Sequence, residues 1–275
     1  MTFSLSAYFS RIGYQGSPRA DLETLRQLHL HHTCAIPFEN LDVLLERPIH
    51  LDDDAVFTKL VSAGRGGYCY EQNGLFHQAL VAIGFDTEHL AARVMLAQPD
   101  TIPPRTHRLL CVTLAGERWI ADVGFGGQTL TAPVRLDNDT VQLTPHGAVR
   151  VVKKGRDYQL LRQKDQQWVT LYQFDLEKQY AADYLMANHF VSTWPDSHFR
   201  HHLQIARHQP DGSINTLFDS GFSQQGQGTS RQVLTPEALY ALLPLHFHLR
   251  LDDAQHGISL ADFGRLMARL SPADA

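Results

Sequence analysis

The spacing of hydrophobic residues changes near residue 87, and this change limits the folds that the chain can adopt. Before it, apolar residues recur at helical intervals, as at Leu22, Leu25 and Leu28. From residue 88 to about 176 they alternate with polar residues in short runs between turn residues, the pattern of an antiparallel sheet or barrel. With 275 residues, 43% of them hydrophobic, the chain can bury a substantial core. We therefore predict an α+β protein.

The last third of the chain mixes both patterns. The turn sequence Pro-Asp-Gly at 210–212 separates two predicted strands at 203–207 and 214–218. Helices are predicted to begin at Thr235, which precedes a proline, and at Ser259. The resulting division is a helical segment at 1–86, a β segment at 87–185 and a mixed segment at 186–275, with a loop rich in glutamine and glycine at 223–230.

The segment RGGYCYEQNGLF, residues 65–76, places a lone cysteine after two glycines at the start of a helical pattern. Gly84 is a suitable end for this helix. Cys69 then lies in the first turn, where unpaired backbone N–H groups and the helix dipole favour the nucleophilic thiolate over the thiol. Cys69 is therefore a candidate nucleophile, although most free cysteines are small buried apolar residues. Arg65 is expected to form a structural ion pair.

A histidine and an aspartate lie downstream of Cys69. His107 precedes the apolar run 109–114, Asp122 lies near the end of the run 118–123, and a hairpin is expected between the runs. A loop of two or four residues places both side chains on one face as diagonal neighbours, whereas a three-residue loop without a bulge places them on opposite faces. We predict the first register, because a carboxylate on an otherwise apolar face needs a partner such as an imidazole N–H. The alternative is an ordinary exposed aspartate at a strand end.

Charge and cysteine usage exclude several classes of protein. The net charge is −5 with a pI near 6.3, and no run of lysine and arginine could follow a phosphate backbone, so no nucleic-acid partner is expected. No apolar run approaches ~20 residues and no basic start precedes an apolar stretch, so neither membrane insertion nor export is expected. Cys34, Cys69 and Cys111 are far apart, which predicts free thiols in the cytoplasm and no CxxC metal site.

Sixteen histidines raise the alternative of a metal-binding module. Two groups have ligand-like spacing, namely His29, His31 and His32, and His198, His201 and His202. Cysteine or acidic ligands at a fitting spacing are missing, so we expect surface or capping histidines and no metal. A second alternative is a cysteine hydrolase of the papain or transglutaminase kind, in which water or a peptide amine discharges the acyl-enzyme.

Four segments resemble those of the bacterial arylamine N-acetyltransferases, in the family's order and with similar spacing. They are CAIPFENLDVLL at 34–45, RGGYCYEQNGLF at 65–76, PPRTHRLLCV at 103–112 and WIADVGFGGQTLTAP at 119–133. Tyr70 and Gln72 depart from the family, where phenylalanine and an aliphatic residue are common. The resemblance implies that the three segments are a helical bundle, an antiparallel β-barrel and an α/β lid around a cysteine-protease-like catalytic core.

The resemblance also implies a reaction. Cys69 would take the acetyl group from acetyl-CoA, His107 would act as base and acid, and Asp122 would orient the imidazole. The acetyl group would pass to an arylamine, a hydrazine or an N-hydroxyarylamine. The sequence leaves open which acceptor is physiological, whether N- or O-acetylation dominates, and whether the chain forms a homodimer.

A last group of residues concerns the substrates. By resemblance, Phe38, Val94 and Phe125 would line the acceptor site, while plain core packing suits Val94 equally well. Gly126 and Gly127 would let the pantetheine arm of CoA approach closely. Taken by itself, the GFGG sequence that contains them lacks the G-x-G-x-x-G spacing and is typical of a tight connection after a strand.

Overall fold

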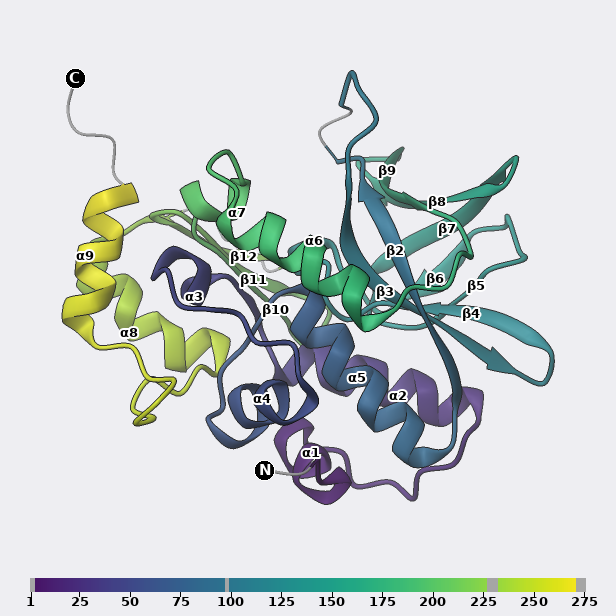
Figure 1. Ribbon diagram of the computed structural model, residues 1–275, viewed down its shortest axis with the longest axis horizontal. Helices are drawn as coiled ribbons and strands as arrows, with labels where there is room; N and C mark the ends of the chain where they lie inside the picture. Colours follow the sequence, from purple (N-terminus) through teal and green to yellow (C-terminus); the bar gives the residue numbers. More distant parts are fainter. Residues whose placement is uncertain (1–2, 97–98, 227–231, 271–275) are drawn as a thin grey trace.

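The computed structural model describes residues 3–96, 99–226 and 232–270. Figure 1 shows the largest sheet at one end of the molecule, the C-terminal helices α8 and α9 at the other, and α6 crossing between them. The helices are α1 Leu5–Ile12, α2 Leu22–Ala35, α3 Leu41–Leu44, α4 Asp53–Phe57, α5 Cys69–Ile83, α6 Ala181–Thr193, α7 His198–His201, α8 Pro236–Phe247 and α9 Leu260–Leu270, with a π-helical turn η1 at Thr58–Ser62 and a 3-10 turn η2 at Gly126–Gln128.

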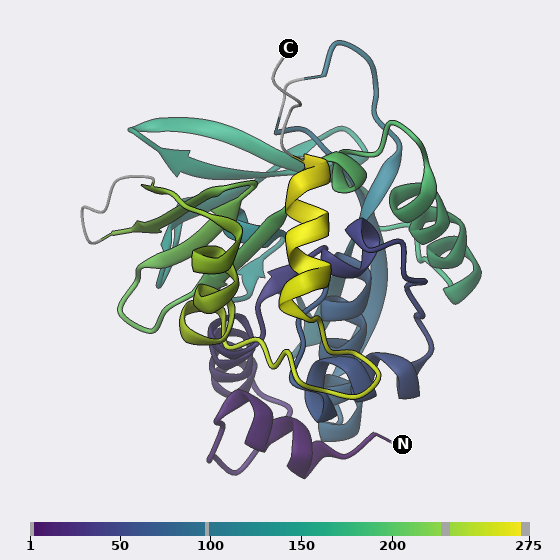
Figure 2. The ribbon, with the colours of Figure 1, turned by 90° about the vertical axis from the view of Figure 1, so that its left-hand side faces the viewer.

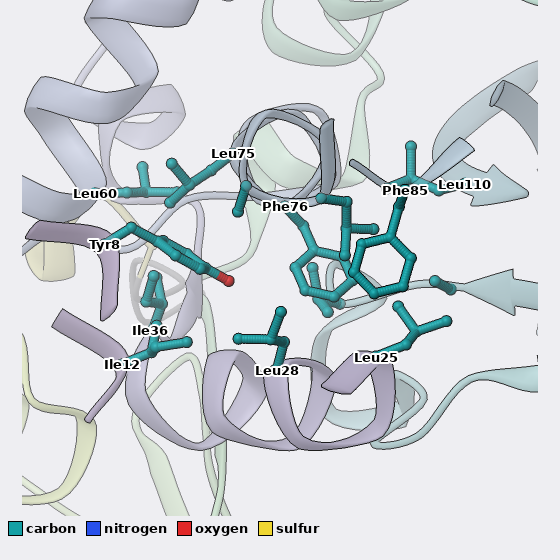
Figure 3. Packing of buried hydrophobic residues seen from close by; sticks show 14 of the residues in the cluster. Tyr8, Ile12, Leu25, Leu28, Ile36, Leu60, Leu75, Phe76, Phe85 and Leu110 are labelled. Atoms are coloured by element: carbon teal, nitrogen blue, oxygen red, sulfur yellow. The ribbon is translucent and has the colours of Figure 1, made fainter. Parts of the chain in front are cut away.

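Local signals fix the ends of the two long N-terminal helices. The Asp21 carboxylate accepts a hydrogen bond from the Thr24 N–H at 2.8 Å and so begins α2. Gly84 adopts the left-handed conformation, φ 100°, and ends α5 at the predicted residue. The two helices pack through a buried apolar cluster, in which Leu28 of α2 faces Phe76 of α5 (Figure 3).

The alternating pattern after residue 87 forms an antiparallel sheet, eight strands of which lie in the described residues. Their order is β5-β4-β3-β2-β9-β8-β7-β6, and β5 approaches β7, so the sheet is a nearly closed barrel as predicted. The strands are β2 Asp86–Val94, β3 Arg105–Leu114, β4 Glu117–Ala121, β5 Val134–Arg135, β6 Gln142–Thr144, β7 Gly147–Lys154, β8 Asp157–Lys164 and β9 Gln167–Phe174.

The β3–β4 hairpin has the register that the sequence predicts. Leu114 pairs with Glu117, so Ala115 and Gly116 form a two-residue loop. Both loop residues have positive φ values, 51° and 80°, as a type I′ turn requires. The even loop length places residue 107 and residue 122 on one face of the hairpin.

A second sheet joins a strand from the N-terminal region to strands from the last third of the chain. Its order is β1-β10-β11-β12-β13, and β1 comes from the helical N-terminal region, with Phe38 opposite Ala206. The predicted hairpin at 203–218 is confirmed, and so are the helix starts after Thr235 and Ser259. Figure 2 shows α9 in yellow on the face turned to the viewer. The strands are β1 Phe38–Glu39, β10 Gln204–His208, β11 Ile214–Phe218, β12 Gly221–Gln225 and β13 Gln232–Val233.

The predicted loop at 223–230 is wrong for its first residues. Residues 223–225 belong to β12, where Ser223 lies opposite Thr216 and their hydroxyls are 2.7 Å apart. Pairing with β11 overrides the loop-like composition. Residues 227–230 lie outside the described residues. No helix in the described ranges combines the length and apolar character needed to cross a membrane.

Buried neutral histidines make the fold sensitive to acid. His32 of α2 is fully buried and bonded to Tyr8 and Gln72, and burial lowers its pKa to about 3. In the unfolded chain a histidine has a pKa of about 6.5. The contribution of His32 to the free energy of unfolding is therefore complete above about pH 6.5 and is lost as the pH falls toward 3.

Glutamine in place of His32 has no group that titrates in this range. We therefore predict that lowering the pH from 7 to 5 reduces the free energy of unfolding of His32→Gln by about 2 kcal/mol less than it reduces that of the wild type. Denaturant titrations at the two pH values measure this difference. Equal losses in both proteins would mean that His32 does not take up a proton on unfolding in this range.

Candidate active site

Cys69 is the first residue of α5, so its thiol lies at the helix N-terminus as predicted. The Glu71 carboxylate accepts the Tyr68 N–H at 3.1 Å, which closes the first turn. The Cys69 thiol donates a long hydrogen bond to the Thr106 carbonyl at 3.8 Å. A Cβ at Gly124 would lie 2.8 Å from the Cys69 Cα, so only glycine lets this loop approach the cysteine. All three cysteines are free, as predicted.

The hairpin brings His107 and Asp122 into direct contact. His107 lies in β3, and Asp122 directly follows β4. The His107 Nε2–H donates to the Asp122 Oδ2 at 2.7 Å, and the side chains are 3% and 0% exposed. Because Nε2 is used in this way, Nδ1 is the nitrogen left for the thiol. The predicted pairing of His107 with the Asp122 carboxylate is therefore present, and the carboxylate is fully buried rather than half-buried.

The two members of this pair stabilise each other's charge. Burial by itself lowers the pKa of His107, but the Asp122 carboxylate and hydrogen bonds to Asp122 and Cys69 outweigh it and raise that pKa to about 10. Burial by itself raises the pKa of Asp122, but His107, Asn73 and the Gly124 N–H hold it below its usual value. His107 is therefore a strong acceptor for a proton that leaves sulfur.

Asn73 holds Asp122 from the helix side, and the sequence analysis missed it. Its Nδ2 donates to the Asp122 Oδ1 at 2.9 Å and to the Arg108 carbonyl at 2.6 Å. Its Oδ1 accepts the Val123 N–H at 3.0 Å. Asn73 lies four residues after Cys69 and hence on the same face of α5. That spacing was the signal in the sequence.

A buried ion network lies at the start of α5. Arg65 Nη2 is 2.7 Å from Glu39 Oε1 and 3.3 Å from Asp42 Oδ1. Lys59 Nζ is 2.7 Å from both Asp42 Oδ2 and Glu71 Oε1. Burial alone lowers the pKa of Arg65 and of Lys59, but the carboxylates outweigh it and raise both. The predicted structural ion pair of Arg65 is confirmed.

The predicted acceptor residues lie at different depths. The Phe125 ring is 4.8 Å from the His107 ring, and Phe38 belongs to the buried cluster around the cysteine. Val94 is half-buried at the end of β2, opposite Tyr172. Tyr172, which the sequence analysis missed, places its ring 5.1 Å from His107 and 5.0 Å from Phe125.

The two predicted CoA-binding glycines lie in η2, which directly follows Phe125. Gly126 has a left-handed backbone, φ 67°, and a Cβ there would lie 3.6 Å from the Phe38 ring. A Cβ at Gly127 would lie 3.4 Å from Thr216 of β11. The GFGG sequence is thus a tight connection packed against strands β1 and β11 of the second sheet.

The histidine groups differ from expectation. His29 and His32 are fully buried between α2 and α5, where both rings contact Phe76, so the expected surface or capping role is wrong for them. The His198 and His202 rings lie 4.6 Å apart. No three histidine, cysteine or acidic side chains in the part of the chain that the structure describes are arranged to hold a metal ion.

Comparisons with known proteins agree with this arrangement. A family model described as N-acetyltransferase matches residues 21–256. The arylamine N-acetyltransferase of Escherichia coli is 49% identical over 98% of this chain and 96% of its own length. The arylamine N-acetyltransferase / N-hydroxyarylamine O-acetyltransferase of Salmonella typhimurium is 49% identical, with the same coverage of both chains.

Solved structures give the same result. The arylamine N-acetyltransferase from Salmonella typhimurium superposes with a TM-score of 0.93 and 48% identity, over 96% of this chain and 97% of that chain. The Mycobacterium marinum arylamine N-acetyltransferase in complex with CoA superposes with a TM-score of 0.89 and 35% identity, over 97% and 98% of the two chains. The chain therefore belongs to the arylamine N-acetyltransferase family.

Proposed function

We propose that this protein transfers an acetyl group from acetyl-CoA to arylamines, arylhydrazines or N-hydroxyarylamines through an acetyl-Cys69 thioester. One arrangement carries the proposal: Cys69 begins α5 beside His107, whose Nε2 is held by Asp122 at 2.7 Å. A nucleophile, a base and an orienting carboxylate support covalent acyl transfer. A thiol at a helix start beside an imidazole is also the core that cysteine proteases use. The two substrates react in turn, which makes the mechanism ping-pong.

In the first half-reaction, Cys69 attacks the acetyl carbonyl of the donor. His107 Nδ1 takes the thiol proton, and the thiolate forms the new carbon–sulfur bond. The first N–H groups of α5 have no acceptor within the helix, and we propose them as donors to the oxyanion. As the adduct collapses, His107 returns the proton to the departing CoA sulfur. The acetyl group remains on Cys69.

In the second half-reaction, the acceptor nitrogen attacks the Cys69 thioester. An arylamine is uncharged at neutral pH, so its lone pair is free, whereas an alkylamine first has to lose a proton. His107 accepts the proton that the nitrogen loses, and Cys69 leaves as the thiolate. With an N-hydroxyarylamine the attacking atom is the hydroxyl oxygen.

The walls of the site suit flat aromatic acceptors. We propose that Phe38 and Phe125 line the acceptor site, with Val94 and Tyr172 beyond them, because aromatic rings bind aromatic groups by edge and face contacts. Gly126 keeps side-chain atoms out of the space beside Phe38, which fits the narrow pantetheine arm. The CoA complex of the M. marinum relative supports acetyl-CoA as the donor.

A cysteine hydrolase remains the competing function, because it uses the same order of residues. The two functions differ in what discharges the acyl-enzyme. An acetyltransferase has to keep its thioester until an amine arrives, whereas a hydrolase loses it to water.

We predict that acetyl-CoA adds a single acetyl group to Cys69 and that aniline then removes it. Intact-mass spectrometry with peptide mapping measures both steps. Cys69→Ala should stay unmodified and show no turnover, whereas Cys34→Ala, which removes a half-buried free thiol of α2, should behave as the wild type. Failure to form an adduct would contradict the covalent mechanism, and an adduct that water removes as fast as aniline would favour the hydrolase.

Asp122→Asn should keep the geometry of the site but lower turnover about a thousandfold or more. The amide cannot stabilise the imidazolium, so the pKa of His107 should fall from about 10 toward about 6.5. Because His107 must be protonated to release the CoA thiol, the alkaline limb of the acetylation rate should move to lower pH. Stopped-flow acetylation across the pH range measures this shift, and near-normal rates would remove Asp122 from the proposed mechanism.

A further inference from the structure

A fully buried histidine of α2 contacts the backbone of the aspartate behind His107. The Asp122 N–H donates to the His29 Nε2 at 3.2 Å. His29 is 0% exposed, and its ring meets the Phe76 ring of α5 edge to face, with the ring centroids 5.6 Å apart. The mechanism proposed above does not use this residue.

The Asp122 N–H, which His29 binds, lies beyond the end of the β3–β4 ladder. The β3–β4 ladder ends where Leu110 pairs with Ala121, one residue before Asp122. A buried backbone N–H without a partner costs free energy comparable to a lost hydrogen bond. His29 supplies the missing acceptor where the chain leaves β4, and so fixes the backbone from which the Asp122 carboxylate projects.

The polar contacts of His29 differ from those of its neighbour His32. Both nitrogens of His32 are engaged, by Tyr8 and by Gln72. Within the described residues, Nδ1 of His29 has no hydrogen-bond partner. The only hydrogen bond of the His29 ring to these residues is therefore the one that Nε2 accepts from the Asp122 N–H. Since Nε2 accepts a hydrogen bond, the proton of the neutral ring is on Nδ1.

We infer that His29 is a positioning residue for the acetyl-transfer reaction, which acts by holding Asp122 in line with His107. The linkage runs from the cysteine through three side chains: Cys69 beside His107, His107 bonded to Asp122, and the Asp122 backbone bonded to His29. Asn73 binds the carboxylate side of Asp122, and His29 binds its backbone side. Asp122 is therefore held at both ends.

The protonation state of His29 agrees with this role. Burial lowers the pKa of His29 to about 4, against the smaller opposing effect of the Asp122 carboxylate. The ring therefore stays neutral, and Nε2 stays an acceptor, at all pH values well above 4.

The test compares three substitutions of His29 that differ in whether they supply an acceptor and in where it lies. Glutamine can put its Oε1 near the position of Nε2, asparagine reaches only the position of Nδ1, and leucine has no acceptor. We expect His29→Asn and His29→Leu to lower kcat by about tenfold to a hundredfold, with KM for acetyl-CoA nearly unchanged, because the carboxylate is displaced. His29→Gln should retain most of the wild-type rate.

A second readout does not depend on acetyl transfer. Alkylation of Cys69 by iodoacetamide at pH 7 should slow in His29→Asn and His29→Leu, because a displaced Asp122 supports the imidazolium less well. The kinetic readout rests on the proposed function, whereas alkylation does not. Alkylation therefore tests the positioning role of His29 separately from the proposed acetyl transfer. A wild type that is alkylated normally but transfers no acetyl group would contradict the proposed function alone.

His208→Leu is the matched control. His208 of β10 is also a buried histidine, 2% exposed, and its ring packs on His146 rather than on Asp122. This variant should lose stability without losing kcat. Equal kcat in the asparagine, glutamine and leucine variants of His29 would overturn the inference. If the asparagine and leucine variants do not fold, nitrogen NMR of the wild type decides, because a His29 ring protonated on Nε2 cannot accept the Asp122 N–H.

Discussion

The fully buried guanidinium of Arg65 is the interaction on which the arrangement of the site depends. It bonds to Glu39 of β1 and Asp42 of α3, and it donates to the His256 carbonyl near the C-terminus. A buried charge costs several kcal/mol unless it is paired, so these segments have to be in place together. Lys59 extends the network to Glu71 in the first turn of α5. Charges that take no part in the chemistry thus fix the position of the nucleophile.

The parts of the site that could be predicted from the sequence are local. The start of α5 follows from two glycines, a helical run and Gly84, all within twenty residues of Cys69. The contact between His107 and Asp122 follows from the length of one hairpin loop, because the side-chain period of a strand is two. The antiparallel strands were likewise visible as alternation, while their closure into a barrel was implied by the family resemblance. Asn73 could also have been found by counting, because it lies four residues after Cys69, but its partner Asp122 could not be predicted in this way.

The parts that were missed depend on contacts between distant segments. Asn73 and Asp122 are 49 residues apart, and His29 and Asp122 are 93 residues apart. His29 and His32 look like surface residues in a polar stretch, and only the packing of α2 on α5 buries them. Residues 223–225 look like a loop until β11 pairs with them. Local propensity and composition do not predict such contacts, because the burial and pairing of a residue depend on the distant segment that packs against it.

The pairing of β1 with β10 also limits how much of the protein can fold while the chain is being synthesised. Phe38 meets Ala206, and Arg65 meets His256 across 191 residues of sequence. During synthesis the ribosome releases the N-terminal helices long before their partners exist. The nascent chain therefore carries Glu39, Asp42 and Arg65 without their final burial. The ion network that positions Cys69 is therefore complete only after residue 256 has been synthesised.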